Sequence, residues 1–323
     1  MRRVICTALG PLDDLVVEDG PDPEPRPGGV VVAVEAAGVN YVDALFVQGR
    51  YQIKPPVPFT PGMEVAGTIA SMGDGVEGWR VGDRVMAMVG LGGYTDRIAL
   101  PALALVRVPD GLALPAAAAF IQSYCTALFA LTRRTQVGAT DTVLVLGAGG
   151  GVGQAAIDVA TALGARVIAA ASTEEKRAAA TALGADAVID YGAADLKTTV
   201  RELTDGGADI VVDPVGGPHA DAALRALRRF GRYLVIGFAA GPIPTIPLNQ
   251  VLLNNRTVLG VDWGAWTMAD PGGQRDLLAE LLRMVERGDL TPPAPDTRPL
   301  DEVAAALTDL LERRVTGKLV LTP

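Results

Sequence analysis

Residues 142–153 read TVLVLGAGGGVG, an apolar run that passes directly into a glycine-rich turn. The run Val143–Leu146 is continuously apolar, which is typical of a strand in a parallel sheet whose two faces are both buried. The residues that follow the turn, Val152–Leu163, have the apolar spacing of a helix. Strand, turn and helix in this order predict the first unit of a doubly wound α/β domain.

The glycine-rich turn predicts a dinucleotide site. Glycines let the backbone turn tightly and approach a pyrophosphate, and the following helix N-terminus offers unpaired N–H groups. A strict GxGxxG motif would need glycine at position 148, where this chain has alanine, so the motif is the weaker AxGxxG. Its strand–turn–helix context supports the prediction, and the alternative is a glycine-rich turn of another doubly wound fold. The expected cofactor-binding residues here are Ala148, Gly150, Gly151, Val152 and Gly153.

The alternation of strands and helices continues outward from this motif. Strands are expected at 142–147, 166–171, 187–190, 209–213, 231–237 and 256–261, and helices at 152–163, 173–183, 196–203 and 218–230. Six such strands form a six-stranded, doubly wound parallel sheet of the Rossmann type. The strand at 256–261 would lie at the edge of this sheet, and unprotected edges invite pairing, so we expect a homodimer through it.

The two ends of the chain have a different pattern. Short strands bounded by Gly, Pro or Asp are expected at 30–38, 65–71, 84–89 and 94–100. Their spacing indicates a small β-rich domain of barrel or sandwich type. Helices are expected at 274–287 and 300–313, before a last strand at 318–322. That strand has no parallel partner nearby in the sequence, so we expect it to return to the N-terminal domain.

Composition limits the kinds of function that are available. With 323 residues the chain fits about two domains, and its one histidine and two cysteines can hardly form a zinc site. The 28 basic and 37 acidic residues leave a net charge of −9, the wrong sign for nucleic acid or an anionic membrane. The N-terminus lacks the apolar region of a signal peptide, and no apolar stretch is long enough to span a membrane. We therefore expect a cytoplasmic protein that uses local positive charge to hold an anionic ligand.

The end of the second expected strand bears on which dinucleotide binds. NAD sites usually carry an acid there to accept a ribose 2′-hydroxyl, but residues 169–172 read Ala-Ala-Ala-Ser. The hydroxyl of Ser172 and the cations Lys176 and Arg177 suit a 2′-phosphate, which favours NADP(H) over NAD(H). The alternative is that residues 174–177 are only the solvated first turn of a helix.

Seven segments, in order across the chain, resemble the zinc-free quinone oxidoreductase (zeta-crystallin-like) branch of the medium-chain dehydrogenase/reductase superfamily. They are Gly38–Asp43, Pro61–Gly67, Tyr124–Ala127, the glycine-rich turn, Val188–Tyr191, Asp213–Gly217 and Gly317–Leu321. The resemblance implies a GroES-like catalytic domain of residues 1–122 and 264–323 and a Rossmann domain of residues 123–263. It also implies an active site in the cleft between the two domains.

The resemblance also explains why we expect no zinc site. In zinc-dependent relatives a cysteine stands where this chain has Asn40, and a histidine stands where it has Met63. An amide and a thioether do not form a tight Zn²⁺ site, so Lewis-acid polarisation of a carbonyl is not expected. The reaction that this leaves is hydride transfer to an acceptor that is already electrophilic, either a quinone or an activated C=C bond.

The resemblance also implies roles for individual residues. Asn40 and Tyr51 are the expected catalytic residues: Asn40 would hydrogen-bond a substrate carbonyl or the cofactor amide, and Tyr51 would donate to a developing oxyanion. The alternatives are that Asn40 bonds loop backbone and that Tyr51 is a half-buried loop aromatic. Some relatives have a second tyrosine where this chain has Leu45, which makes the pocket more apolar. Further cofactor contacts are expected from Thr126, Tyr191, Gly237, Phe238, Ala239 and Lys318.

These expectations combine into one function with two alternatives. The favoured function is that of an NADPH-dependent quinone reductase. The first alternative is an NADPH-dependent enoyl or enone reductase, which differs from it only in pocket shape. The second is a non-enzymatic NADPH-binding protein.

Overall fold

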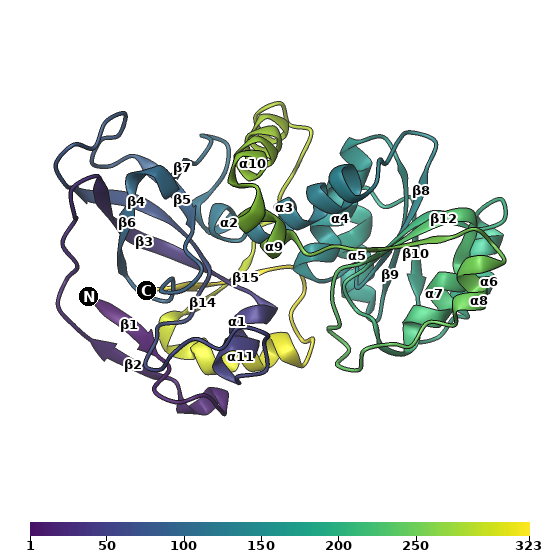
Figure 1. Cartoon of the computed structure of the whole chain (residues 1–323), viewed down its shortest axis with the longest axis horizontal. Coiled ribbons are helices and arrows are strands. Elements are labelled where there is room, and N and C mark those ends of the chain that lie inside the picture. Colours follow the sequence, from purple (N-terminus) through teal and green to yellow (C-terminus); the bar gives the residue numbers. More distant parts are fainter. The chain divides into compact units, whose positions relative to one another are not determined.

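The computed structural model describes residues 1–323 and divides them into two compact units, each of which is described by itself (Figure 1). The terminal unit comprises residues 1–122 and 293–323, and the central unit comprises residues 123–292. No helix combines the length and the apolar character that crossing a membrane requires.

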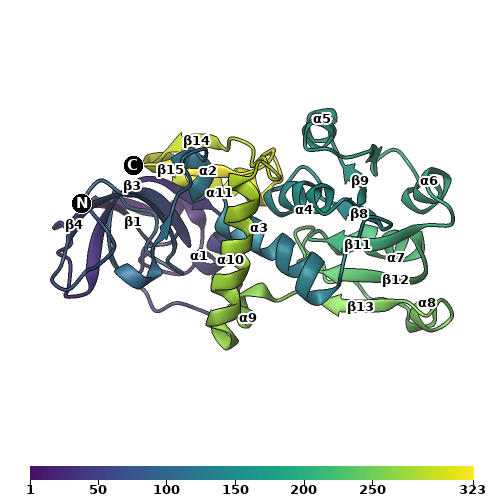
Figure 2. The same cartoon turned by 90° about the horizontal axis from the view of Figure 1, so that it is seen from above.

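The central unit is built on a six-stranded parallel sheet. Its strands are β8 (Thr142–Leu146), β9 (Arg166–Ala171), β10 (Ala187–Asp190), β11 (Ala208–Asp213), β12 (Leu227–Val235) and β13 (Thr257–Gly260). Their order is β10-β9-β8-β11-β12-β13, and Figure 2 shows β11, β12 and β13 side by side. The chain proceeds in opposite directions from β8 and from β11, so the switch point of a doubly wound sheet lies between them. The expected sheet is confirmed, and β13 is its edge.

Helices connect these strands. They are α4 (Gly151–Ala162), α5 (Glu174–Ala182), α6 (Leu196–Leu203), α7 (Ala220–Ala226) and α8 (Leu248–Leu252). The helix expected at 218–230 is wrong at its C-terminal end, because β12 already pairs with β11 at Leu227. Phe230 then takes a positive φ of 63° and donates its N–H to the Asn254 carbonyl, a conformation that no helix continues through.

The central unit extends further along the chain than the resemblance implies. It contains residues 264–292, with α9 (Trp263–Ala269) and α10 (Pro271–Glu286), whereas we assigned residues from 264 onward to the GroES-like domain. The reason is packing against α3 (Ile121–Leu128) and the π-helix that follows it. The rings of Trp266 and Phe129 stack with centroids 4.7 Å apart, and Arg133 forms a 2.7 Å ion pair with Glu280.

The terminal unit contains a mainly antiparallel sheet. Its strands are β3 (Gly29–Val39), β4 (Glu64–Met72), β5 (Arg84–Met88), β6 (Arg97–Pro101), β7 (Val106–Arg107), β14 (Asp296–Pro299) and β15 (Leu319–Thr322). The strand order is β14-β15-β3-β4-β5-β7, with β6 also paired to β3. The last strand returns to β3, as expected, and Leu319 lies opposite Val39. The expectation that it has no parallel partner nearby is wrong, because β14 pairs with it in parallel.

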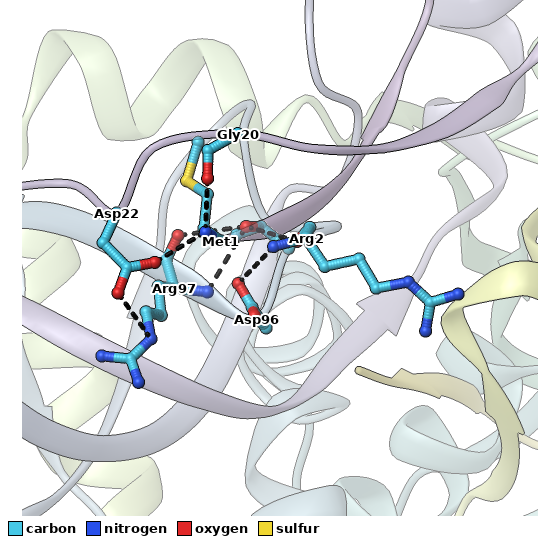
Figure 3. A network of polar contacts seen from close by, with 7 residues as sticks. Met1, Arg2, Gly20, Asp22, Asp96 and Arg97 are labelled. Carbon is cyan, nitrogen blue, oxygen red and sulfur yellow. Dashed lines mark hydrogen bonds and ion pairs between the residues drawn. The ribbon is translucent and has the colours of Figure 1, made fainter.

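Short elements complete the terminal unit. They are β1 (Arg2–Ile5), β2 (Val16–Asp19), α1 (Tyr41–Val47), α2 (Leu114–Ala118) and α11 (Val303–Leu311). The hairpin of β1 and β2 is tied down at its end by polar contacts (Figure 3). The Met1 ammonium donates to the Gly20 carbonyl at 2.7 Å and to Asp22 at 2.6 Å, and Asp22 lies 3.6 Å from the Arg97 guanidinium. These contacts join the hairpin to β6.

Candidate functional site

The glycine-rich turn connects β8 directly to the N-terminus of α4. Gly147 adopts a φ of +59°, and the Gly150 N–H closes the turn on the Gly147 carbonyl at 2.9 Å. A Cβ atom on Gly153 would lie 2.2 Å from that carbonyl oxygen, so only glycine allows this close approach of helix to turn. The N–H groups of Gly151, Val152 and Gly153 form the first turn of α4, where helices have no internal acceptors.

Ala148 has a different role from the other residues of the turn. Its side chain is fully buried, and its N–H donates to the Ala170 carbonyl of β9 at 3.1 Å. This bond anchors the turn to the neighbouring strand. Ala148 therefore shapes the turn, whereas Gly150, which precedes the first turn of α4, is exposed.

The predicted cations follow β9 on α5. Thr173 caps this helix by accepting the Lys176 N–H at 3.3 Å, and Ser172 before it is exposed. The Lys176 side chain lies on the turn, since a Cβ on Gly149 would be 2.4 Å from its Cγ. The Arg177 guanidinium lies 2.9 Å from the Asp190 carboxylate and also donates to the Ala171 carbonyl at 3.3 Å.

Sequence reasoning missed Asp190 as a site residue at the carboxyl ends of these strands. It ends β10, opposite Ala171 at the end of β9, so the acid that we expected to be absent from one strand arrives from the next. The signal was available, because both strands were expected to end at these residues and parallel neighbours end at one edge. Tyr191, the next residue, packs its ring 4.4 Å from the ring of His219.

The loops after β11 and β12 lie together at the same edge of the sheet. The Asp213 carboxylate accepts the N–H groups of Val215 and Gly216 at 2.8 Å each and the hydroxyl of Tyr233. Burial, followed by the negative charge of Asp213, raises the pKa of Tyr233. The predicted residues Gly237, Phe238 and Ala239 pack on this loop: the Ala239 N–H donates to the Pro214 carbonyl at 3.2 Å, and a Cβ on Gly216 would be 2.8 Å from Phe238 Cδ1.

Thr126 lies on α3, where it is buried. Two residues before it, Tyr124 donates its hydroxyl to Asp158 of α4 at 2.7 Å, and Asp158 also accepts the Thr291 N–H at 3.0 Å. Burial raises the pKa of Asp158. These bonds fix α3 against α4.

In the terminal unit Asn40, Glu64 and Lys318 form one polar cluster, the Asn40 cluster. The Lys318 ammonium donates to Asn40 Oδ1 at 2.6 Å and to Glu64 Oε1 at 2.9 Å, and Asn40 Nδ2 donates to the same Glu64 oxygen at 3.0 Å. Glu64 is fully buried, and its second oxygen accepts the Gln122 N–H at 3.1 Å. Sequence reasoning named Asn40 and Lys318 for different roles and missed Glu64, which belongs to the quoted segment Pro61–Gly67.

A second buried pair holds the backbone of Asn40. Asp43 Oδ2 accepts the Asn40 N–H and the Tyr94 hydroxyl, both at 2.8 Å. Burial raises the pKa of Asp43 to about 7. The bond to Glu64 uses one of the two amide hydrogens of Asn40, so the amide nitrogen retains one donor position.

Tyr51, the other expected catalytic residue, lies on the loop after α1. Its ring packs edge-on against Phe46, with centroids 5.0 Å apart and planes at 76°. Met63, which precedes Glu64, is half-buried against the core of this unit. No group of three or more His, Cys, Asp or Glu side chains is placed to hold a metal ion.

The residues of the central unit fit a dinucleotide. The first turn of α4 offers backbone donors at the switch point of the sheet, and the Lys176 and Arg177 side chains supply positive charge beside it. Gly153 lets the start of α4 lie close against the Gly147 carbonyl of the turn, where any side chain would push the helix away. This donor set suits a pyrophosphate and a phosphorylated ribose.

Two family models match parts of the chain. Residues 26–110 match the alcohol dehydrogenase GroES-like domain, and residues 151–283 match the family described as zinc-binding dehydrogenase. The first match covers strands β3 to β7 of the terminal unit, and the second covers most of the central unit.

Similar proteins span the whole chain. The quinone oxidoreductase-like protein 2 homolog of Nematostella vectensis is 38% identical over 99% of this chain and 88% of that relative. The quinone oxidoreductase of Thermus thermophilus, whose structure was also solved in complex with NADPH, is 37% identical with a TM-score of 0.85, covering 100% of both chains. A solved NAD-dependent alcohol dehydrogenase is 32% identical with a TM-score of 0.91, also covering 100% of both chains.

Proposed function

Because the chain belongs to the zinc-free quinone oxidoreductase (zeta-crystallin-like) branch of the medium-chain dehydrogenase/reductase superfamily, we propose that it is an NADPH-dependent quinone reductase. The members of this family are oxidoreductases, and so is this chain. The observation that carries the proposal is the open first turn of α4 with Lys176 lying on the glycine-rich turn that precedes it. When bound, NADPH supplies a hydride from its nicotinamide ring.

The adenosine half of the cofactor is assigned to the central unit. The N–H groups of Gly151, Val152 and Gly153 would donate to the pyrophosphate, where the positive end of the α4 dipole also favours negative charge. Ser172, Lys176 and Arg177 would hold the 2′-phosphate. The Thermus relative with an NADPH complex supports this choice of cofactor.

Replacing Lys176 tests this assignment. Lys176→Met keeps the stem that lies on Gly149 but removes the charge, so NADPH affinity should fall by roughly ten- to a hundredfold, as for a lost hydrogen bond to a charged group. NADH affinity should change by less than about threefold, since NADH has no 2′-phosphate. Fluorescence titration of both nucleotides measures this, with Lys197→Met on α6 as the control variant. Equal losses for NADPH and NADH would contradict the assignment.

The Asn40 cluster is proposed to act on the substrate and the nicotinamide end of the cofactor. The remaining N–H of the Asn40 amide would donate to a substrate carbonyl or the cofactor amide. Lys318 would bring positive charge to the cofactor, and Tyr51 would donate to the oxyanion that develops on the acceptor. We propose that the reaction needs no zinc, because Asn40 and Met63 stand where zinc-dependent relatives have ligands.

Turnover decides between the candidate substrates. Oxidation of NADPH is followed at 340 nm against ortho- and para-quinones, enals, enones and enoyl thioesters, with and without a chelator. We expect the fastest turnover with a quinone and no loss on chelation. Preference for an enone or enoyl thioester would mean that the substrate is an activated C=C bond and not a quinone. NADPH binding without any turnover would favour a non-enzymatic role. Loss of activity on chelation would contradict independence from zinc.

We further propose that the chain forms a homodimer through the edge of the central sheet. Exposed apolar side chains lie on the edge strand β13, on α8 and in the segments that flank α8, namely Val258, Leu248, Leu252, Ile243 and Leu253. Phe230 is also exposed, and its N–H bonds the Asn254 carbonyl next to Leu253. Apolar side chains next to an open strand edge are typical of a surface that pairs with a second copy.

A further inference from the structure

The ion pair of Arg177 and Asp190 lies at the carboxyl ends of β9 and β10, and each of its members has a further hydrogen-bond partner. Arg177 Nη1 lies 2.9 Å from Asp190 Oδ2 and 3.3 Å from the Ala171 carbonyl oxygen, which ends the neighbouring strand. Asp190 Oδ1 accepts the Gly192 N–H at 2.9 Å. Both oxygens of the carboxylate are therefore engaged, and the carboxylate cannot turn away from Arg177 without losing a hydrogen bond.

The pair remains open to solvent and to a ligand. The Arg177 side chain is 21% exposed and that of Asp190 is 34% exposed. Partly exposed pairs of this kind contribute little to stability, so exchanging one partner of Arg177 for another costs the fold little.

The position of the pair relates it to the adenosine ribose. Ala148 of the glycine-rich turn bonds the Ala170 carbonyl, one residue before Ala171, and Lys176 next to Arg177 lies on Gly149. The pair thus lies at the end of β9, where doubly wound folds distinguish the two nicotinamide dinucleotides by the 2′ group of the ribose.

The two members of the pair have opposite preferences at that position. A carboxylate accepts a hydrogen bond from a 2′-hydroxyl and repels a 2′-phosphate, whereas a guanidinium attracts the phosphate. In this chain the two groups are paired with each other: the Asp190 carboxylate, which would favour NADH, binds the Arg177 guanidinium, which would favour NADPH.

We propose that Asp190 sets the preference of this chain between NADPH and NADH by competing with the 2′-phosphate for Arg177. This inference rests on the proposed binding of NADPH to the central unit. The 2′-phosphate gains Arg177 only by displacing Asp190 or by approaching its negative charge, so Asp190 lowers NADPH affinity. Asp190 also offers NADH an acceptor for its 2′-hydroxyl, so it raises NADH affinity.

The substitution Asp190→Asn tests the proposal, because it removes the charge and keeps a carbonyl oxygen for the Gly192 N–H. With the full-length chain we expect the Kd of NADPH to fall by about tenfold, as for a charge-assisted contact that becomes available, and the Kd of NADH to stay equal or rise. Calorimetric titration measures both. Asp221→Asn is the matched control, since Asp221 forms a 2.8 Å pair with Arg225 on α7, and it should leave both constants unchanged.

A second variant tests the other member of the pair. Arg177→Gln should weaken NADPH by at least about tenfold and leave NADH within about twofold, and it should reduce the gain that Asp190→Asn produces. Unchanged or weaker NADPH binding by a folded Asp190→Asn chain overturns the inference, as do equal losses of both nucleotides in Arg177→Gln. If the unsubstituted chain binds NADPH and these shifts are missing, only this inference fails. If it binds neither nucleotide, the proposed function fails as well.

Discussion

Asn40 shows how a single residue can be restrained through both its backbone and its side chain. Its backbone N–H is held by Asp43, its amide nitrogen by Glu64 and its amide oxygen by Lys318. The bond to Lys318 joins residues 278 positions apart. The helix start at Tyr41 would explain only the first of these contacts, so the orientation of the amide depends on the tertiary structure.

The first prediction concerns Glu64, which joins the other two members of the Asn40 cluster. Glu64→Gln keeps an oxygen acceptor but leaves the Lys318 ammonium without its carboxylate, and breaking a buried pair costs about 3 kcal/mol. Urea unfolding should show a loss of about this size. Glu280→Gln is the control, because its pair with Arg133 is exposed and should contribute less than about 1 kcal/mol. Similar losses in both variants would show that the Asn40 cluster is not a buried pair in solution.

The second prediction concerns Asp43, whose pKa is raised to about 7 by burial. The folded chain keeps this proton at pH values where the unfolded chain, with its ordinary pKa near 3.8, has lost it. The stabilisation from protonated Asp43 is therefore complete below about pH 4 and is lost as the pH rises to 7. The slope for one proton is about 1.4 kcal/mol per pH unit.

The variant Asp43→Asn cannot titrate and should remove this slope. Free energies of unfolding at pH 4.5, 5.5, 6.5 and 7.5 should fall more steeply with pH in the unsubstituted chain than in the variant. Parallel pH curves would mean that Asp43 does not carry a raised pKa. The hydrogen bond from Tyr94 lowers that pKa, so Tyr94→Phe should extend the slope to higher pH.

At the scale of elements, the unit of β8, glycine-rich turn and α4 was predictable because its pattern is local. A continuous apolar strand, glycines in the turn and an apolar helix lie within about 20 residues, and their succession, more than any one of them alone, predicts the unit. Elements that depend on neighbours were less predictable. The residues 227–230 read as the continuation of a helix, but pairing with β11 makes them part of β12.

The third prediction separates two roles of glycine in this turn. A methyl group on Gly153 would clash with the Gly147 carbonyl at 2.2 Å, so Gly153→Ala should lower the free energy of unfolding by about 2 kcal/mol and weaken NADPH binding. A methyl group on the exposed Gly150 would meet nothing closer than 3.5 Å. Gly150→Ala should therefore leave stability within about 0.5 kcal/mol and weaken NADPH binding by narrowing the approach to the first-turn amides. Equal stability losses would contradict the close packing at Gly153.

At the scale of the whole molecule, the fourth prediction concerns the proposed homodimer. Leu252 on α8 is 74% exposed among other apolar side chains beside the edge of the sheet. Leu252→Glu should convert a dimer into a monomer in light scattering after size exclusion, because a charge would be buried at the interface. Leu103→Glu is the control, since Leu103 is 90% exposed but lies in the terminal unit, and it should leave the dimer intact. A monomeric unsubstituted chain would exclude this interface.

The sequence by itself determined the two fold types, the dinucleotide motif and the positions of most central strands. These follow from local properties, namely the spacing of apolar residues, the positions of glycines and the residues that bound each strand. Only the tertiary structure decided which of those residues meet. Residues 296–299 join the last strand in parallel, residues 264–292 pack in the central unit, and Glu64 bridges Asn40 and Lys318. Asp190 reaches Arg177 because β9 and β10 end at one edge. Contacts of this kind follow from strand order and long-range packing, which no local pattern of residues specifies.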